Sequence, residues 1–595
     1  MKIYSKILSE TKLRTKIFAF LGLAFLITIS FIKSGGTGGL PKGDSDNGGL
    51  FLPGGFDAVV VHDSVGRARH LAVNSNGDVY VKLRVPIDGK GSVALRDNNN
   101  DGKADIVEYF GNYPDVGNYG TAMRIHKGYL YFTTAGEVYR TKMTPGKMIP
   151  ESKAELLVTD DYKNDVHGSS HIAKPLAFDD KGNMFVPFGS PSDVCGIYDR
   201  QPGSLGKNPC PELDEHAGIW KFSDSKPNQT LKKDGVRYAT GIRSVVAMDW
   251  NKYDKTLYVV QHGRDDFVRQ FPDMYNPWQS ALLPAEEFFR VPEGMDGGWP
   301  YYYFDYMQGK KLLNPEYGGD GKKELQPGSK VSMPLIGFPG HFAPNDLFFY
   351  TGNQFPDRYK NGAFIAFHGS TIRSPYPQGG YFIGFVPFKN GKPSGDWEVF
   401  ADGFPGRDTL INTSDASYRP MGIAMGPDGS LYLSESEKGK IWRVMYKGDK
   451  KSFGAAQLAS MQKRKETQAH IKTPDIIKDN VNTAKIAAGA KLYNTYCATC
   501  HQTNGKGDGT RFPPLENSEY VKGDRRRLID IVLHGLNGPI TVNGVGYNEV
   551  MPPANYLSDD QIALILTYVR ANFKNNLTGV LPGEVARIRQ QGKKP

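Results

Sequence analysis

The sequence contains little cysteine, with four residues among 595, which excludes a small disulfide-stapled scaffold. It also lacks a basic stripe with a nucleic-acid motif, although its formal net charge is +10. The 73 basic residues are spread among 63 acidic ones, so we expect a basic soluble surface and no nucleic-acid partner. Glycine is abundant, at 69 residues, and aromatic residues reach 12%. Many turns together with many aromatic residues favour a mainly β body.

The longest apolar run, residues 17–32, follows a segment rich in Lys and Arg. This order is typical of an export signal, and the run is slightly shorter than the ~20 residues that span a membrane. No small-residue cleavage site follows, so residues 1–33 are either a signal peptide or a signal anchor. We expect the rest of the chain to be exported, either periplasmic or anchored through residues 17–32 and facing the periplasm. Residues 34–55 are interpreted as a Gly-rich linker.

A β-hairpin pattern recurs between residues 56 and 446. Each copy has an apolar segment, a polar turn and a second apolar segment rich in aromatic residues, and most turns contain Gly, which adopts positive φ without strain. The copies lie at residues 70–81, 123–132, 176–186, 246–259, 347–365 and 422–433. Six copies predict a six-bladed β-propeller, with a β-sandwich or two stacked barrels as the alternative.

The composition changes after residue 446. Residues 447–482 are polar, which indicates a linker or a solvated helix. Helices are expected over 484–496 and 558–573, and Ser558 with Gln561 forms a capping box for the second. These helices predict a small all-α domain over residues 483–577, followed by a tail over 578–595.

The motif Cys497-Ala-Thr-Cys500-His501 has the spacing of covalent haem attachment. Two thiols on one turn can form thioethers with the haem vinyl groups, and His501 can then ligate the iron. A redox dithiol or half of a zinc site are the alternatives, but no second Cys pair and no βαβ context accompany the motif. Met551, in a Met-Pro-Pro loop, is expected as the sixth ligand, with His534 as its competitor.

Residues 484–573 resemble a small monohaem cytochrome c. The resemblance rests on the order of N-terminal helix, C-x-x-C-H motif, Met-Pro loop and C-terminal helix. It implies electron transfer through haem c with Met551 as the axial ligand.

Two features lie in loops of the propeller. Cys195 and Cys210 either form a disulfide, as an exported chain favours, or remain as buried thiols. The other feature is a twelve-position pattern that fits a calcium loop, with Gly102 at the sharp turn, and a polar loop tip is the alternative. Its predicted oxygen ligands are Asp97, Asn99, Asp101, Lys103 through its carbonyl, Asp105 and Glu108.

Basic side chains recur where the first strand of a blade begins. His171, Arg243 and Arg419 each precede such a strand, and these positions converge on one face of a propeller. A ring of His and Arg there suits an anionic ligand, although each residue taken singly fits a structural His or a surface Arg equally well.

These positions also carry a second resemblance. The segments around His171, 238–243, 297–300, 368–373 and 419–420 resemble the glucose/sorbosone dehydrogenase family, over most of residues 56–446. The resemblance implies a propeller that binds pyrroloquinoline quinone (PQQ) beside Ca²⁺. It implies that His171 is the general base. This sequence departs from the family pattern at two positions, where Ser244 replaces an Asn and Met421 replaces an Arg. By the same resemblance the PQQ contacts are Arg243, His368, Arg373 and Arg419, and the calcium ligands are Gly263, Arg264 and Asp265.

Together these features predict a quinohaemoprotein oxidoreductase. It would oxidise a sugar or polyol hydroxyl with PQQ, with His171 taking the proton, and pass electrons through haem c. The external acceptor would be a cytochrome, an oxidase or the quinone pool. The alternatives are a non-enzymatic propeller that carries an electron-transfer cytochrome, or a calcium-dependent propeller lactonase.

Overall fold

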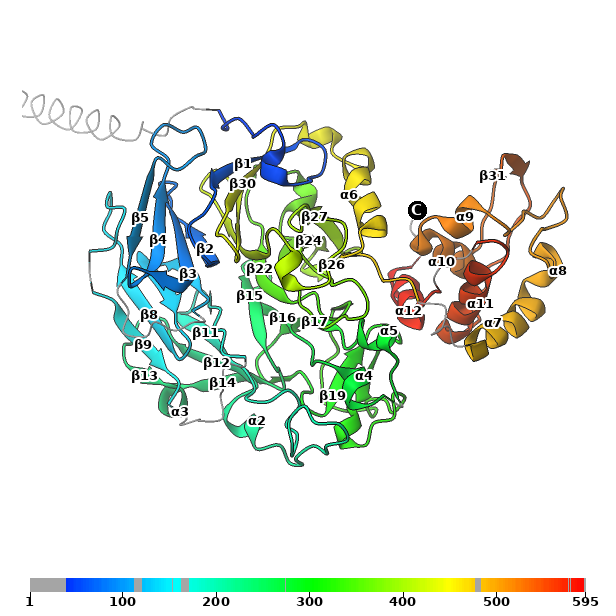
Figure 1. Cartoon of the computed structure of the whole chain (residues 1–595), viewed down its shortest axis with the longest axis horizontal. Helices are drawn as coiled ribbons and strands as arrows, with labels where there is room; N and C mark the ends of the chain where they lie inside the picture. The colour runs from blue at the N-terminus through cyan, green and yellow to red at the C-terminus, as the bar shows by residue number, and fades with distance from the viewer. Residues whose placement is uncertain are drawn as a thin grey trace, which may run out of the picture. The chain divides into compact units, whose positions relative to one another are not determined.

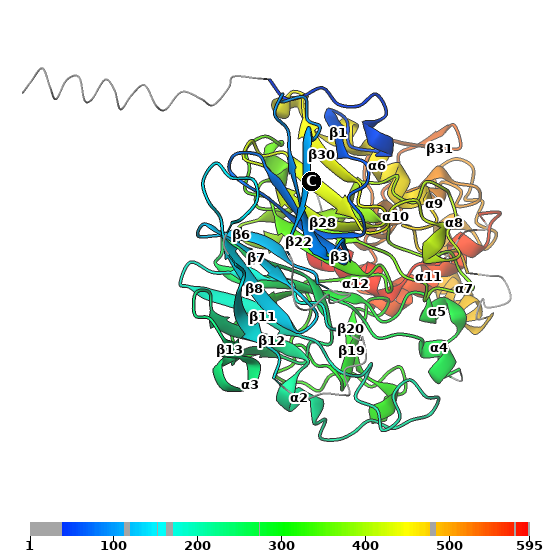
Figure 2. The same cartoon turned by 60° about the vertical axis from the view of Figure 1, so that its left-hand side comes forward.

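The computed structural model describes residues 39–111, 120–151, 153–161, 171–272, 274–476, 483–575, 577 and 579–592. Within residues 56–446 six sheets of four or five strands form the blades of a β-propeller (Figures 1 and 2). The six-bladed fold expected from the recurring hairpins is confirmed, because each predicted hairpin supplies the first two strands of one blade.

The blades follow one another along the chain, except that three edge strands come from other segments. The first blade comprises β2 (Ala68–Val73), β3 (Val79–Ile87), β4 (Lys90–Arg96) and β5 (Ile106–Phe110). The second comprises β6 (Met123–His126), β7 (Tyr129–Thr133), β8 (Glu137–Lys142), β9 (Glu155–Thr159) and β13 (Gln229–Thr230). The third comprises β10 (Ala177–Phe178), β11 (Asn183–Phe188), β12 (Gly218–Ser223), β14 (Val236–Thr240) and β18 (Met295–Asp296). The fourth blade comprises β15 (Val245–Asn251), β16 (Thr256–Gln261), β17 (Glu286–Val291) and β21 (Ile336–Phe338). The fifth comprises β22 (Pro344–Phe349), β23 (Ala363–Phe367), β24 (Phe382–Val386) and β27 (Glu398–Ala401). The sixth comprises β28 (Pro420–Met425), β29 (Leu431–Glu435), β30 (Ile441–Tyr446) and β1 (Phe56–His62).

The loops carry smaller elements. These are the strand pairs β19 (Tyr302–Asp305) with β20 (Lys310–Leu313) and β25 (Phe388–Lys389) with β26 (Lys392–Pro393), and the helices α2 (Glu212–Glu215), α3 (Leu231–Asp234), α4 (Phe267–Gln270) and α5 (Pro277–Ser280).

The N-terminal strand β1 closes the propeller. It pairs antiparallel with β30, so that Phe56 lies opposite Tyr446 and the last blade contains strands from both ends of the domain. This pairing covers the edge of β30 and completes the ring, which removes open strand edges. The hairpin pattern did not predict this closure, because β1 has no neighbouring partner in the sequence.

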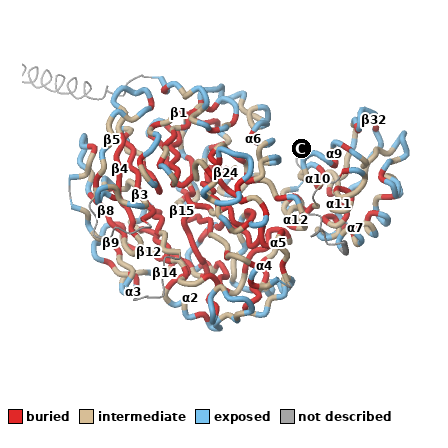
Figure 3. Tube along the Cα trace, in the orientation of Figure 1, coloured by how far each residue is buried: buried red, intermediate tan, exposed pale blue. Residues whose placement is uncertain are grey.

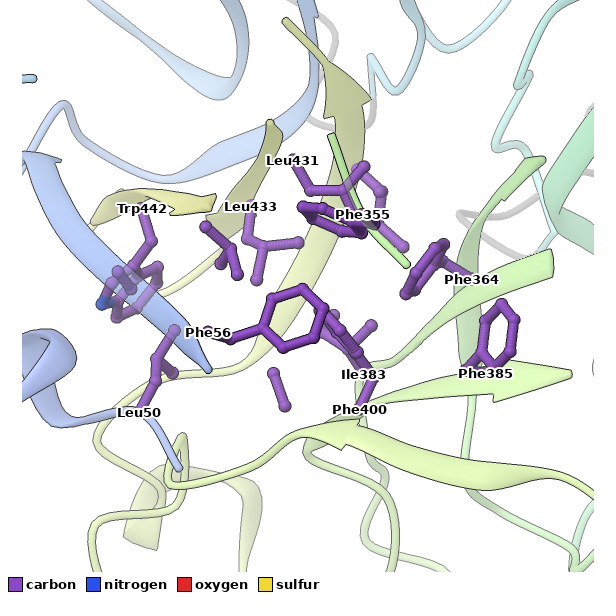
Figure 4. Close-up of a cluster of buried hydrophobic side chains, with 14 of the residues drawn as sticks. Leu50, Phe56, Phe355, Phe364, Ile383, Phe385, Phe400, Leu431, Leu433 and Trp442 are labelled. Carbon is purple, nitrogen blue, oxygen red and sulfur yellow. The ribbon is translucent and has the colours of Figure 1, made fainter. Parts of the chain in front are cut away.

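Aromatic side chains fill the space between the last two blades. The Phe56 ring packs edge-on against Phe355 at 4.8 Å and Phe400 at 5.1 Å between centroids, with Trp442 in the same cluster (Figure 4). Buried positions follow the strands of the blades (Figure 3). Such clusters between blades hold the ring together by apolar burial, and the loops above them are free to carry polar groups.

Both segments expected to be linkers pack against the propeller. In the 34–55 segment, Leu50 belongs to the aromatic cluster and is 4% exposed. In the 447–482 segment, α6 (Ala455–Thr467) buries Met461, and both Arg464 and His470 bind the buried Asp402 at 2.6 and 2.9 Å. Residues 455–476 therefore form an ordered strap along the propeller, which we call the strap.

The C-terminal helices surround a separate apolar core. They are α7 (Thr483–Tyr496), α8 (Ala498–His501), α9 (Glu519–Lys522), α10 (Arg525–His534), α11 (Asp559–Ala571) and α12 (Pro582–Gln591), with the short strands β31 (Ile540–Val542) and β32 (Val545–Tyr547). The Ser558–Gln561 capping box is present at the start of α11. The segment expected to be a tail contains α12, because Val585 and Ile588 lie one turn apart and bury themselves in this core.

Within the residues that the structure describes, no helix is both long and apolar enough to cross a membrane. The expected leader, residues 17–32, lies outside them.

Candidate functional site

The predicted basic residues meet on one face of the propeller. His171, Arg243 and Arg419 each lie in the loop that enters the first strand of a blade, and His262 and His368 each follow a second strand. These strands pair antiparallel, with Val245 opposite Gln261 and Pro344 opposite Phe367, so the start of one meets the end of the other at the same face. We call this the site face.

His171 is a neutral imidazole with one nitrogen held. Its Nδ1–H donates to the Ser190 carbonyl oxygen at 2.7 Å, which leaves Nε2 as the basic nitrogen. Burial, assisted by the charge of Arg243, lowers the pKa of His171 to about 3. A Cβ at Gly189 would overlap the His171 carbonyl oxygen, so glycine is required where the two loops meet. This geometry suits a proton acceptor.

Arg243 is held by a carboxylate that the sequence analysis missed. Its Nη2 donates to Asp193 Oδ1 and its Nε to the Asp193 carbonyl oxygen at 3.1 Å. Burial alone would raise the pKa of Asp193, but Arg243, Arg264 and Arg200 hold it at about 2. Asp193 thus stays ionised and presents Arg243 in one orientation. The signal available in the sequence was its position two residues before Cys195.

Cys195 and Cys210 form the disulfide that was the first of the two predicted alternatives, and it closes the loop directly after Asp193. Both cysteines are buried, and Trp299, from the predicted 297–300 segment, packs with them and donates its Nε1–H to the Asp193 carbonyl oxygen at 2.9 Å. The disulfide and Trp299 therefore fix the backbone that carries Asp193.

The three predicted calcium ligands lie together, but their groups have other partners. The Gly263 carbonyl oxygen accepts Arg243 Nη1 at 2.7 Å, and the Arg264 side chain turns away to Glu316, 2.6 Å from Oε2. Asp265 pairs with Arg200 at 3.1 Å. Among the described residues, no three His, Cys, Asp or Glu side chains gather as a metal site. Calcium here would depend on the backbone carbonyls of Gly263 and Arg264, with the carboxylate of Asp265 in the same segment.

His368 and Arg419 form a second basic pair on the site face. Arg419 Nη2 donates to His368 Nδ1 at 2.8 Å, and His368 Nε2–H donates to Ser436 Oγ at 2.7 Å, so the imidazole is a fixed neutral tautomer. Burial, and next the charge of Arg419, lowers the pKa of His368 well below its usual value. The predicted contact Arg373 instead packs inward, fully buried over the Phe342 ring, with Nε 3.2 Å from the Gly340 carbonyl oxygen.

In the helical domain, Cys497 directly follows α7 as the N-cap of α8, and Cys500 and His501 lie in the single turn of α8. The His501 Nδ1–H donates to the Pro513 carbonyl oxygen at 2.9 Å, which directs Nε2 toward a ligand. Met551 exchanges backbone hydrogen bonds with Leu536 at 2.9 and 3.0 Å, which fixes the Met-Pro loop beside α10. The competitor His534 pairs with Asp530 at 2.9 Å.

The predicted calcium loop is a tight polar turn. Asp97 accepts the amide hydrogens of Asn100 at 2.7 Å and Gly102 at 2.8 Å, and Gly102 has φ +90° as the motif requires. Asp105 accepts the Asn98 amide at 2.6 Å, and Glu108 lies in β5. The carboxylates are engaged within the loop, and calcium binding stays a prediction.

Comparisons with known proteins agree with this two-part architecture. Residues 322–447 match the TrAA12-like family model and residues 486–572 match the cytochrome c family model. Cytochrome c-552 of Thermus thermophilus is 44% identical over 87 residues, which are 14% of this chain and 66% of that protein. The fructose dehydrogenase cytochrome subunit of Gluconobacter japonicus is 32% identical over 123 residues, 20% of this chain and 25% of that protein. The chain thus spans only part of the curated relatives it matches.

The propeller also matches a solved structure. The PQQ domain of pyranose dehydrogenase from Coprinopsis cinerea has a TM-score of 0.53 and 16% identity, and the match covers 67% of this chain and 97% of that domain. The chain therefore joins a propeller like that of the PQQ-dependent sugar dehydrogenases to a cytochrome c domain, as the sequence predicted.

Proposed function

We propose that this protein is an exported quinohaemoprotein dehydrogenase that oxidises a hydroxyl group of a sugar or polyol. The proposal rests on one observation: the neutral His171 lies on the same face as Arg243 and the Arg419–His368 pair. Its Nδ1 is hydrogen-bonded to Ser190, and its Nε2 makes no hydrogen bond to its own loop. A proton acceptor beside an anion-binding group is what oxidation of an alcohol by an anionic cofactor requires.

The residues present fit PQQ, which carries three carboxylates. Arg419 has one carboxylate neighbour within the described chain, Glu437 at 3.5 Å, so positive charge on the site face is only partly balanced. Asn345, beside His262, adds a buried carboxamide to the same region. Arg243 and Arg419 would hold the cofactor carboxylates, while His368, whose two ring nitrogens are already engaged, would orient Arg419. The Gly263 and Arg264 carbonyls with Asp265 would hold Ca²⁺.

The chain's own groups then have defined roles. Bound PQQ supplies a quinone that accepts a hydride from the substrate carbon. His171 takes the hydroxyl proton at Nε2 while the Ser190 carbonyl holds its Nδ1–H. An anion bound against Arg243 would offset the charge that lowers the pKa of His171 and would make this base stronger. In the cytochrome domain, Cys497 and Cys500 would bind haem, with His501 and Met551 as iron ligands, and an external carrier would receive the electrons.

The test uses the purified full chain containing haem. We expect substrate-dependent reduction of the haem only after incubation with PQQ and calcium, measured by its visible absorption across a panel of sugars and polyols. Failure of PQQ to bind would favour the non-enzymatic binding propeller. Hydrolysis of sugar lactones by the chain without PQQ would favour a lactonase. Persistence of the haem–sulfur absorption band in Met551→Ala would exclude Met551 as a ligand.

A further inference from the structure

Glu286, the first residue of β17, places its carboxylate between two loops of the site face. Oε2 accepts the Gly263 amide hydrogen at 2.9 Å and Oε1 accepts the Ala343 amide hydrogen at 3.1 Å. Glu286 is 2% exposed, so water cannot replace its carboxylate as the hydrogen-bond acceptor of these two amides. A single side chain therefore joins the loop after β16 to the loop before β22.

Both loops carry groups of the site. Gly263 binds Arg243 through its carbonyl oxygen at 2.7 Å, and the carbonyl of Pro344, next to Ala343, accepts His262 Nε2–H at 2.8 Å. The second loop holds two non-glycine residues at positive φ, His341 at +67° and Ala343 at +53°. L-residues adopt that region at a cost, so the loop needs contacts that hold it there.

The adjacent residue, Glu287, supports the same site from the opposite face of β17. Its Oε1 accepts Gln261 Nε2 at 3.1 Å, and Gln261 Oε1 accepts the Arg243 amide hydrogen at 3.0 Å. The charge of Glu287 is balanced by Lys311 at 2.9 Å. Glu287 reaches Arg243 through one intermediate residue, Gln261, whereas Glu286 binds its two loops directly. Glu286 also has no ion-pair partner among the described residues, so its substitution gives the cleaner test.

We propose that Glu286 is the positioning residue of the cofactor pocket, holding the Gly263 carbonyl and the 341–344 loop in their binding arrangement before the cofactor arrives. The inference rests on the proposed function, because PQQ and calcium are the ligands expected at these loops. A pocket whose backbone is already in place does not spend binding free energy on ordering it. Loss of the carboxylate would therefore weaken cofactor binding without removing any group that touches the cofactor.

The experiment compares Glu286→Gln with Asp179→Asn in the full haem-containing chain. Asp179 is the matched control, since it is also a buried carboxylate that accepts two backbone amides, Lys181 and Asn183, but in the β10–β11 turn. Glu286→Gln keeps the side-chain size and offers one acceptor oxygen in place of two. We expect amide hydrogen exchange at Gly263 and Ala343 to accelerate at least tenfold without PQQ, and the Kd for PQQ with calcium to rise about tenfold. Asp179→Asn should change neither.

The outcomes separate this inference from the proposed function. PQQ binding and amide exchange in Glu286→Gln equal to those of the wild type would overturn the positioning role alone. A wild type that does not bind PQQ would overturn both. Near-UV circular dichroism reports folding. If Glu286→Gln does not fold, Glu286→Asp, which retains the carboxyl group on a shorter side chain, should show the same two effects at smaller size. Wild-type values in Glu286→Asp would then count against the inference.

Discussion

The two candidate cofactor sites of this protein are assembled over very different distances along the chain. In the cytochrome domain, Cys497, Cys500 and His501 come from one short segment, and the helix geometry alone brings them together. On the propeller, the side chains of the site face, from His171 to Arg419, come from separate blades and meet only when the ring has closed. The comparison teaches that a local motif identifies its cofactor directly, whereas a site built from distant loops depends on supporting contacts such as Asp193 and Glu286.

The largest expected effect separates the two regions completely. The double substitution Cys497→Ser and Cys500→Ser should abolish covalent haem, because serine forms no thioether, while substrate oxidation with a dye acceptor continues in the PQQ-loaded propeller. Haem staining of the denatured chain measures the first effect. The matched control, Cys195→Ser with Cys210→Ser, removes the propeller disulfide and should retain haem. Stained haem in the first variant would contradict the attachment.

The next effect concerns the propeller alone. His171→Gln should lower the rate of haem reduction by substrate by roughly two to four orders of magnitude, the usual contribution of a general base. Burial, assisted by the charge of Arg243, lowers the pKa of His171 to about 3 in the cofactor-free chain, so the base is unprotonated there above pH 4. An anion bound against Arg243 raises this pKa, so the pH at which the wild-type rate begins to fall measures how far bound PQQ strengthens the base. Stopped-flow measurements from pH 7 down to pH 4 check both points. An unchanged rate in the variant would assign His171 a structural role.

Asp193→Asn tests whether the propeller site needs its support. It leaves Arg243 and Arg264 buried without their shared carboxylate, which costs about 3 kcal/mol of stability. The pKa of Asp193 is lowered from 3.8 to about 2, so its contribution should be complete above pH 4 and lost as pH falls toward 2. Urea unfolding of wild type and variant across this range measures the difference. The control is Asp199→Asn in the same loop, and equal losses in both would refute a special role for Asp193.

A smaller effect concerns the strap that leads from one region toward the other. Asp402→Asn weakens the contacts to Arg464 and His470, so the strap should detach more often and be cleaved faster by trypsin. All six tryptophans precede residue 447, so quenching of their emission by haem reports the separation of the two domains. We expect emission to rise in Asp402→Asn and to stay constant in Lys463→Ala, an exposed control on α6. Constant emission and cleavage in both variants would show that Asp402 does not hold the strap.

The smallest expected effect is at the predicted calcium loop. Calcium that binds only the folded state raises its stability by mass action, and at this chain size a gain of 1 kcal/mol shifts Tm by only about 2 °C. The shift between calcium and chelator should disappear in Asp97→Ala with Glu108→Ala. This variant also separates the loop from any calcium bound on the site face. Identical melting curves for the wild type in both buffers would remove the loop as a calcium site.

Much of the fold could be predicted from local patterns. The hairpins around turns such as Asn76-Gly77 gave the number of blades, and Ser558 with Gln561 marked the start of the last predicted helix. These signals are local because turn geometry and helix capping involve residues only a few positions apart. The pairing of β1 with β30 was missed, since two strands at opposite ends of a domain carry no mark of their partnership.

The candidate site was predicted in part. His171, Arg243 and Arg419 were predicted from their repeated position at the blade starts and His368 from the family resemblance, and the structure places all four on the site face. Arg373, predicted as a cofactor contact by the same resemblance, lies buried over Phe342. The residues that support the site face could not be found in this way. Asp193 and Glu286 act on partners in other loops. Asp193 had only its proximity to Cys195 as a signal, and no sequence pattern marked Glu286.

By itself, the sequence determined the division into a propeller and a cytochrome c domain, the haem-attachment motif and the basic residues at the blade starts. Those features follow from periodicity, turn chemistry and short spacings, which depend on neighbouring residues. Only the tertiary structure decided that β1 closes the ring, that α12 completes the cytochrome core, and that Asp193 and Glu286 hold the site loops. Each of these depends on burial between segments far apart in the chain, where a carboxylate or an apolar face finds its partner only after folding.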